Sequence, residues 1–157
     1  MQKEMIEACG SISNEQVMEV RWGDCDAAGI VYYAKYFDLF TDGRVALLQQ
    51  VGLPYQQTFH EQGIVVVAVE ASCRYRKNLK PEEKYILNTK LARLGRTRMV
   101  FEYIITKFDD HSIACEGKTV HTYVDDTGKP FDLKKRRPDL WAKLEECTKQ
   151  FYCLGNI

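Results

Sequence analysis

The sequence has no excess of either charge and no long apolar run, and each absence excludes a class of protein. Lysine plus arginine and aspartate plus glutamate both number 22, so the formal net charge is zero. Proteins that bind nucleic acid or an anionic membrane usually carry a basic surface, so neither partner is expected. No segment reaches the roughly 18 consecutive apolar residues of a membrane-spanning helix. The N-terminus also lacks the apolar segment of a signal peptide, and we expect a cytoplasmic protein.

The cysteines and histidines do not have the spacing of a metal site or of a disulfide framework. Six cysteines are scattered singly and form no Cys-x-x-Cys pair. The histidines lie far apart without the His-x-x-x-His spacing of a metal-binding helix; these are His60, His111 and His121. His121 could reach the helix side of the predicted sheet, but a structural role is the simpler interpretation. Ser72 and Cys73 lack the context of a nucleophile elbow. We therefore expect reduced thiols and no metal site.

Hydrophobic periodicity predicts one long helix and several strands. Residues 1–13 have no sustained period and are expected to form a loosely held leader. Apolar residues at helical spacing predict a helix over about 33–51, and Gly52 followed by Pro54 is a typical stop signal. Alternating or continuous apolar patterns predict strands at 16–22, 64–76, 84–94, 97–107 and 112–124. Pro138 opens a terminal helix that is expected to extend to about residue 150.

This order of elements predicts an α+β fold in which one long central helix packs on an antiparallel sheet. A chain of 157 residues favours one domain, with a core over about 15–130 and the terminal helix over about 138–150. Gly43 inside the helix suggests close packing against another backbone. One helix leaves apolar surface and strand edges uncovered, so we expect a homodimer or a homotetramer.

The stretch between the first strand and the long helix contains two acids and several small residues. Asp24 and Asp26 precede Gly29 in a predicted turn, and the helix begins shortly afterwards. Backbone N–H groups at a helix N-terminus form a positive pole that favours developing negative charge on a substrate oxygen. Asp26 would stand beside this pole. The simpler alternative is that both are ordinary turn acids, and Asp24 in particular could pair with an arginine or cap the turn.

The same stretch resembles the opening motif of the hotdog-fold acyl-CoA thioesterases, especially the 4-hydroxybenzoyl-CoA thioesterase type. The motif reads Arg-Trp-Gly-Asp-Cys-Asp-Ala-Ala-Gly-Ile-Val-Tyr-Tyr-Ala-Lys-Tyr over residues 21–36. The resemblance implies hydrolysis of an acyl-CoA to a carboxylic acid and free CoA. It makes Asp26 the nucleophile or general base and the Tyr33 amide the oxyanion donor, with Gly29 and Ile30 shaping the turn. This chemistry requires a placed carboxylate and a backbone donor but no cofactor.

Residues that would bind the acyl-CoA are also suggested. Tyr33 and Tyr36 could line an acyl pocket, although aromatic residues at helical spacing belong to the core more often. CoA carries phosphates that arginine binds well, and the turn at Arg96 and Thr97 resembles the nucleotide-side loop of the family. The alternative for this turn is a solvated strand edge protected by charge. The basic run 134–137 is expected to be solvated.

Several alternatives stay open at this point. Many family members that act on short acyl chains carry histidine where this chain has Tyr33, so histidine-assisted chemistry does not carry over and the aromatic-substrate branch is favoured. A hydratase or dehydratase acting on acyl thioesters, and a non-catalytic acyl-CoA binding module, are the rival functions, since fold does not establish function. The sequence leaves open the acyl group, CoA against acyl carrier protein as the thiol, and dimer against tetramer.

Overall fold

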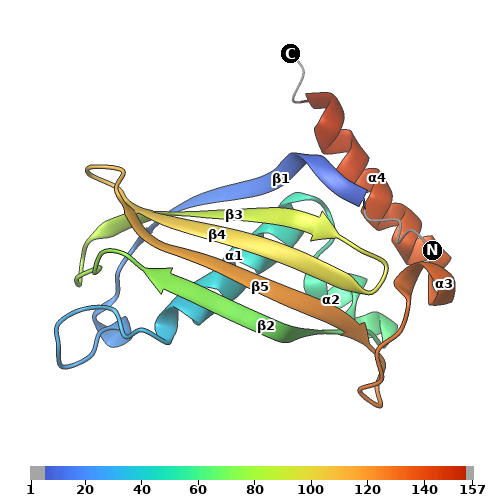
Figure 1. Cartoon of the computed structure of the whole chain (residues 1–157), viewed down its shortest axis with the longest axis horizontal. Coiled ribbons are helices and arrows are strands. Elements are labelled where there is room, and N and C mark those ends of the chain that lie inside the picture. Colours follow the sequence, from blue (N-terminus) through green and yellow to red (C-terminus); the bar gives the residue numbers. More distant parts are fainter. Residues whose placement is uncertain (1–5, 155–157) are drawn as a thin grey trace.

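The computed structural model describes residues 6–154, and within this range five strands form one antiparallel sheet (Figure 1). The strand order is β1-β3-β4-β5-β2, so that β1 and β2 are the two edges. The bounds are β1 Ile6–Glu19, β2 Val65–Tyr75, β3 Lys84–Leu94, β4 Arg98–Lys107 and β5 Ile113–Val124. This is the predicted α+β architecture, and the last four strands match the predicted ranges to within one residue at each end.

One long helix lies across a face of the sheet, and a second packs beside β1 at the edge (Figure 1). The helices are α1 Lys35–Gln50, α2 Tyr55–Thr58, α3 Leu133–Arg136 and α4 Pro138–Leu154. Short 3-10 turns, η1 Trp22–Asp24 and η2 His60–Gln62, flank the first two helices. None of the helices in the described range is both long and apolar enough to cross a membrane.

The core forms between α1 and the sheet. The buried residues of α1 recur at intervals of three and four, as expected for a helix with one apolar face; they are Tyr36, Leu39, Phe40, Gly43, Leu47 and Leu48. The Phe40 ring stacks on Tyr103 of β4 with centroids 4.2 Å apart. At Gly43, an added Cβ would overlap Thr89 Oγ1 of β3. Gly43 is closely packed as expected, but its neighbours are side chains of β3 and not another backbone.

The N-terminal segment differs from the prediction. The sequence predicts the first strand at 16–22, whereas β1 begins at Ile6 and ends at Glu19. Its first half pairs with the end of β3, where Ile6 lies opposite Leu94. A strand takes its hydrogen bonds from its neighbour, so residues 6–13 are ordered without any hydrophobic period of their own. Residues 1–5 of the expected leader lie outside the described range. After Glu19 the chain leaves the sheet and forms η1.

Candidate functional site

The acidic stretch folds into a tight hairpin before α1. Asp26 N–H donates to the Ile30 carbonyl at 3.1 Å, and Gly29 N–H donates to the Asp26 carbonyl at 3.0 Å. Cys25 and Val31 form an isolated antiparallel bridge. Gly29 has a φ of 74°, a conformation that costs other residues strain. Gly29 and Ile30 therefore occupy the turn positions expected of them.

The two acids of the hairpin have different surroundings. The Asp24 carboxylate accepts from Arg21 Nε at 3.1 Å, and Lys35 Nζ lies 4.0 Å away. Asp24 thus takes the arginine-paired role that the sequence left open for it. The side chain of Asp26 is exposed and Oδ1 accepts from Ala28 N–H at 2.8 Å. Among residues 6–154, no cation lies within 4 Å of Asp26, so this carboxylate is not committed to an ion pair.

The backbone immediately before α1 carries an unpaired donor. The helix begins at Lys35, two residues later than predicted, and Tyr33 lies in the preceding turn. The Tyr33 carbonyl accepts from the hydroxyl of Tyr75 at 2.7 Å, which ties this turn to the end of β2. Within the described range, the Tyr33 N–H has no acceptor. Unpaired N–H groups are the source of the positive pole at a helix start.

Aromatic side chains surround the hairpin. Trp22, Tyr32 and Tyr33 are 69%, 40% and 62% exposed, and the rings of the two tyrosines lie 4.8 Å apart. Tyr36 is buried below this surface and packs edge-on against Tyr75, with centroids 5.1 Å apart. Burial raises the pKa of Tyr36 far above its usual value, so this hydroxyl stays neutral. Tyr33 is therefore placed at the open surface, whereas Tyr36 belongs to the core in this chain.

Arg96 and Thr97 form the turn between β3 and β4, where both are tied to neighbouring segments. Arg96 Nη2 lies 2.6 Å from Asp132 Oδ2, and the Arg96 carbonyl accepts from Leu133 N–H at 2.8 Å. The Thr97 carbonyl accepts from Thr122 Oγ1 at 2.8 Å. The turn is thus braced against the segment that leads into α3.

This turn lies at the opposite end of the sheet from the hairpin (Figure 1). β3 begins at Lys84, opposite Glu19 and close to the hairpin, and ends at Leu94. Eleven residues of strand span roughly 30–35 Å. A single chain therefore does not bring Arg96 and Thr97 to Asp26, because a hairpin turn lies a full strand length away from the start of its first strand.

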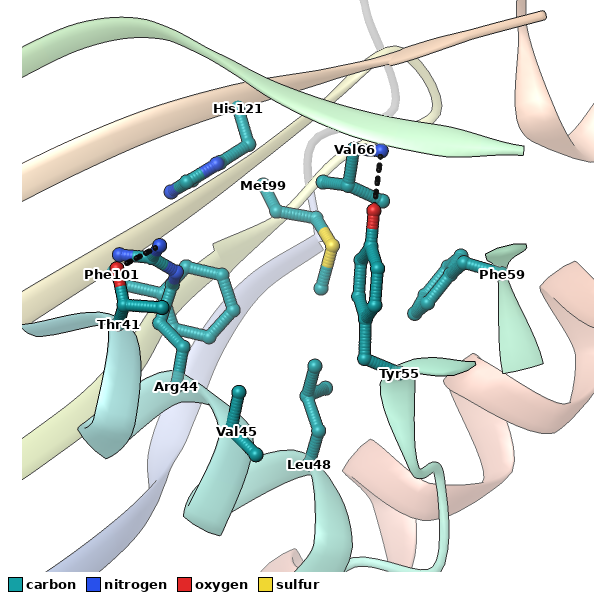
Figure 2. Close-up of a pocket in the computed structure, with 10 residues that line it drawn as sticks. All are labelled: Thr41, Arg44, Val45, Leu48, Tyr55, Phe59, Val66, Met99, Phe101 and His121. Carbon is teal, nitrogen blue, oxygen red and sulfur yellow. Dashed lines mark hydrogen bonds between the residues drawn. The ribbon is translucent and has the colours of Figure 1, made fainter. Parts of the chain in front are cut away.

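Sequence reasoning did not identify a cavity between α1, α2 and the sheet (Figure 2). Its volume is about 150 Å³. No local pattern in the sequence shows that the polar side chain of Arg44 turns back over the sheet. The cavity is lined by Thr41, Arg44, Val45, Leu48, Tyr55, Phe59, Val66, Met99, Phe101 and His121.

A chain of hydrogen bonds leads from the cavity into the core. Arg44 Nη1 donates to the Tyr103 hydroxyl at 2.9 Å, and Nη2 donates to Thr41 Oγ1 at 3.0 Å. The hydroxyls of Tyr103 and Thr119 are 2.7 Å apart, and His121 Nε2 lies 2.8 Å from Thr119 Oγ1. Burial, reinforced by the Arg44 cation, lowers the pKa of His121 to about 4. His121 is therefore neutral near pH 7, and Arg44 carries the charge of this group.

The chain matches known proteins over most of its length. The family model for the thioesterase-like superfamily matches residues 20–144. A 1,4-dihydroxy-2-naphthoyl-CoA hydrolase from Synechococcus elongatus is 25% identical over 103 residues, which cover 65% of this chain and 74% of that protein. The hairpin and α1 both lie inside the range that the family model matches.

Solved structures share the fold. The DHNA-CoA thioesterase from Staphylococcus aureus superposes with a TM-score of 0.80 at 24% identity, covering 92% of this chain and 96% of that one. A mutant 4-hydroxybenzoyl-CoA thioesterase, solved in complex with 4-hydroxybenzoyl-CoA, superposes with a TM-score of 0.72 at 18% identity, covering 84% and 98%. The resemblance inferred from residues 21–36 is confirmed. The chain belongs to the thioesterase-like superfamily of hotdog-fold acyl-CoA thioesterases.

Proposed function

We propose that the protein hydrolyses an acyl-CoA thioester, with Asp26 as nucleophile or general base and the Tyr33 amide as oxyanion donor. The observation that carries this proposal is the hairpin itself. Residues 24–26 pair with residues 30–32, so that an exposed carboxylate without an ion-pair partner and an unpaired N–H at a helix start share one small loop. The acyl-CoA relatives support the choice of substrate class.

Either role of Asp26 gives a complete reaction. As nucleophile, a carboxylate oxygen attacks the thioester carbon, the carbonyl oxygen gains charge beside the Tyr33 N–H, and the CoA thiolate leaves. Water then cleaves the mixed anhydride, which releases the acid and restores Asp26. As general base, Asp26 takes a proton from the water that attacks the same carbon. Both routes need the same carboxylate and the same donor.

We propose further that the site is completed by a second copy of the chain across β2. This strand is a sheet edge, and its side chains include Val69 and Tyr75, which are 51% and 44% exposed. A long, unpaired edge strand favours pairing with another chain. Antiparallel pairing of β2 with itself would put the Tyr75 end, with its hairpin, beside the Val65 end of the other copy. Arg96 and Thr97 of that copy lie at this same end, where they could meet the CoA phosphates.

Thiol release from aromatic and aliphatic acyl-CoA substrates, measured for wild type and Asp26→Asn, tests the reaction. We expect Asp26→Asn to bind acyl-CoA and to lose turnover by about 10²–10⁴-fold. Asp24→Asn is the matched control, because its carboxylate serves an ion pair, and it should retain turnover within about tenfold. Wild-type turnover in Asp26→Asn would contradict the assigned role. Binding of acyl-CoA by wild type without thiol release would favour the binding-module or dehydratase alternatives.

Oligomeric state tests the assembly. Sedimentation of wild type should give a dimer, or a tetramer built from it. A charged residue in the middle of the proposed pairing, Ala71→Glu, should weaken the assembly and lower turnover together. A monomer with full turnover would contradict the shared site.

A further inference from the structure

Arg44 is a half-buried cation with no carboxylate partner at the wall of an apolar cavity. Its guanidinium donates two hydrogen bonds, to the neutral hydroxyls of Tyr103 and Thr41. Within the described range, no aspartate or glutamate oxygen lies within 4 Å of its guanidinium. A guanidinium has five N–H donors, so donors are left over after these two bonds. Partly burying a charge without an anion costs free energy unless a partner is supplied.

The guanidinium and imidazole groups gather on one side of the cavity, and the Tyr55 hydroxyl on the other side is already bonded to Val66 N–H. Figure 2 shows Thr41, Arg44 and His121 on one side, with Tyr55 and Phe59 on the other. His121 is buried and its low pKa keeps it neutral, so it does not add a second charge. A ligand that fits this lining has an apolar body with an oxygen at one end.

The size of the cavity limits the ligand. A cavity of about 150 Å³ lined by apolar side chains is large enough to hold benzene in other proteins. The space therefore accepts a single ring or a short branched chain. Thr41 and Val45 are exposed, so the cavity reaches the surface along the outer side of α1.

The cavity lies at the end of β2 where the proposed pairing would bring the hairpin of a second copy. Thr41 lies eight residues after Tyr33, or about 12 Å along the helix. An acyl group bound at the hairpin of one copy would therefore not extend readily into the cavity of the same copy. Val66, which lines the cavity, lies at the start of β2, and its N–H donates to the hydroxyl of Tyr55 of α2 at 3.2 Å. The β2 pairing proposed above would bring the other hairpin to this end.

We propose that Arg44 is a specificity-determining residue that binds an oxygen at the end of the acyl group remote from the thioester. This inference rests on the proposed thioesterase function. The apolar part of the cavity takes the body of the acyl group, and the guanidinium binds a ring hydroxyl or a terminal carboxylate. The hydrogen bonds that the guanidinium donates to Tyr103 and Thr41 hold it in place. Acyl groups of the same size without this oxygen leave Arg44 unpaired and are disfavoured.

Matched substrate pairs test the inference. The kcat/KM ratio of 4-hydroxybenzoyl-CoA to benzoyl-CoA reports a ring hydroxyl, and the ratio of glutaryl-CoA to valeryl-CoA reports a terminal carboxylate. We expect wild type to favour the oxygenated member of at least one pair by about 10–100-fold, in line with a hydrogen bond to a charged group. Arg44→Met should lower that ratio to about 1 and change the plain substrate only a few-fold. Arg44→Lys should restore part of the preference, and Lys143→Met, at an exposed position of α4 beside the opposite edge of the sheet, should leave it unchanged.

The outcomes separate this inference from the proposed function. If wild type releases thiol but has no preference in either pair, or if a folded Arg44→Met keeps the wild-type ratio, the role of Arg44 is wrong and the thioesterase function stands. If wild type releases no thiol from any substrate, the thioesterase function is wrong. In that case binding of 4-hydroxybenzoate, benzoate and glutarate to wild type and Arg44→Met is measured by NMR. Equal binding by both proteins overturns the assignment of Arg44, and a loss confined to the oxygenated ligand supports it.

Discussion

The buried imidazole of His121 makes the stability of the protein depend on pH. His121 is 4% exposed, and burial followed by the nearby Arg44 cation lowers its pKa from 6.5 to about 4. The unfolded chain therefore binds a proton at His121 at a higher pH than the folded chain does. Because the pKa is depressed on folding, the unfolded state gains protons first as the pH falls. The contribution of neutral His121 to the free energy of unfolding is complete above about pH 6.5 and is lost as the pH falls toward 4.

The size of the effect follows from the shift. A difference of one pKa unit between the unfolded and the folded chain corresponds to 1.36 kcal/mol. The lowered pKa of His121 therefore changes the free energy of unfolding by about 3 kcal/mol between a pH well above 6.5 and a pH well below 4. Between pH 7.5 and pH 5 we expect a loss of about 2 kcal/mol in the free energy of unfolding. This is a substantial part of the stability of an ordinary domain.

Urea unfolding followed by circular dichroism at pH 7.5, 6 and 5 measures this loss. Protein concentration is held constant, because an oligomer is stabilised by mass action. His121→Gln should be less stable than wild type at pH 7.5 but should lose about 2 kcal/mol less on going to pH 5. His60→Gln, which changes an exposed histidine, should keep the wild-type pH dependence. Equal pH dependence in wild type and His121→Gln would refute the reasoning.

Three further substitutions test the packing of α1 and the hairpin by the same unfolding measurement. Gly43→Ala should destabilise by about 1–3 kcal/mol, because the new Cβ meets Thr89 Oγ1; adding Thr89→Ala should restore stability, and failure to do so would place the clash elsewhere. Gly117→Ala should cost about 1–3 kcal/mol by displacing the Phe40 ring, and an unchanged midpoint would contradict this contact. Tyr75→Phe removes the hydroxyl that braces the backbone before α1; we expect a loss of about 1 kcal/mol and reduced thiol release, whereas full activity would show that this brace is dispensable.

The fold could be predicted from the sequence largely because its signals are local. Alternation and short connections identified β3, β4 and β5, and Gly52 marked the end of α1. The first half of β1 could not be found this way, because residues 6–13 are ordered by pairing with β3 and have no period of their own. The start of α1 was placed two residues early, since tyrosines at helical spacing occur in the turn before it as well.

In the candidate site, too, the local features could be predicted from the sequence and the contacts between distant segments could not. The sequence by itself determined the hairpin with Asp26, Gly29 and Ile30, because a tight turn depends on glycine geometry and on hydrogen bonds between residues a few positions apart. Only the tertiary structure decided that Asp24 pairs with Arg21 while Asp26 remains open. It also decided that Arg44 turns over the sheet toward Tyr103, 59 positions away in the chain. Contacts between distant segments depend on how a helix is rotated on its sheet, and no local pattern of residues encodes that rotation.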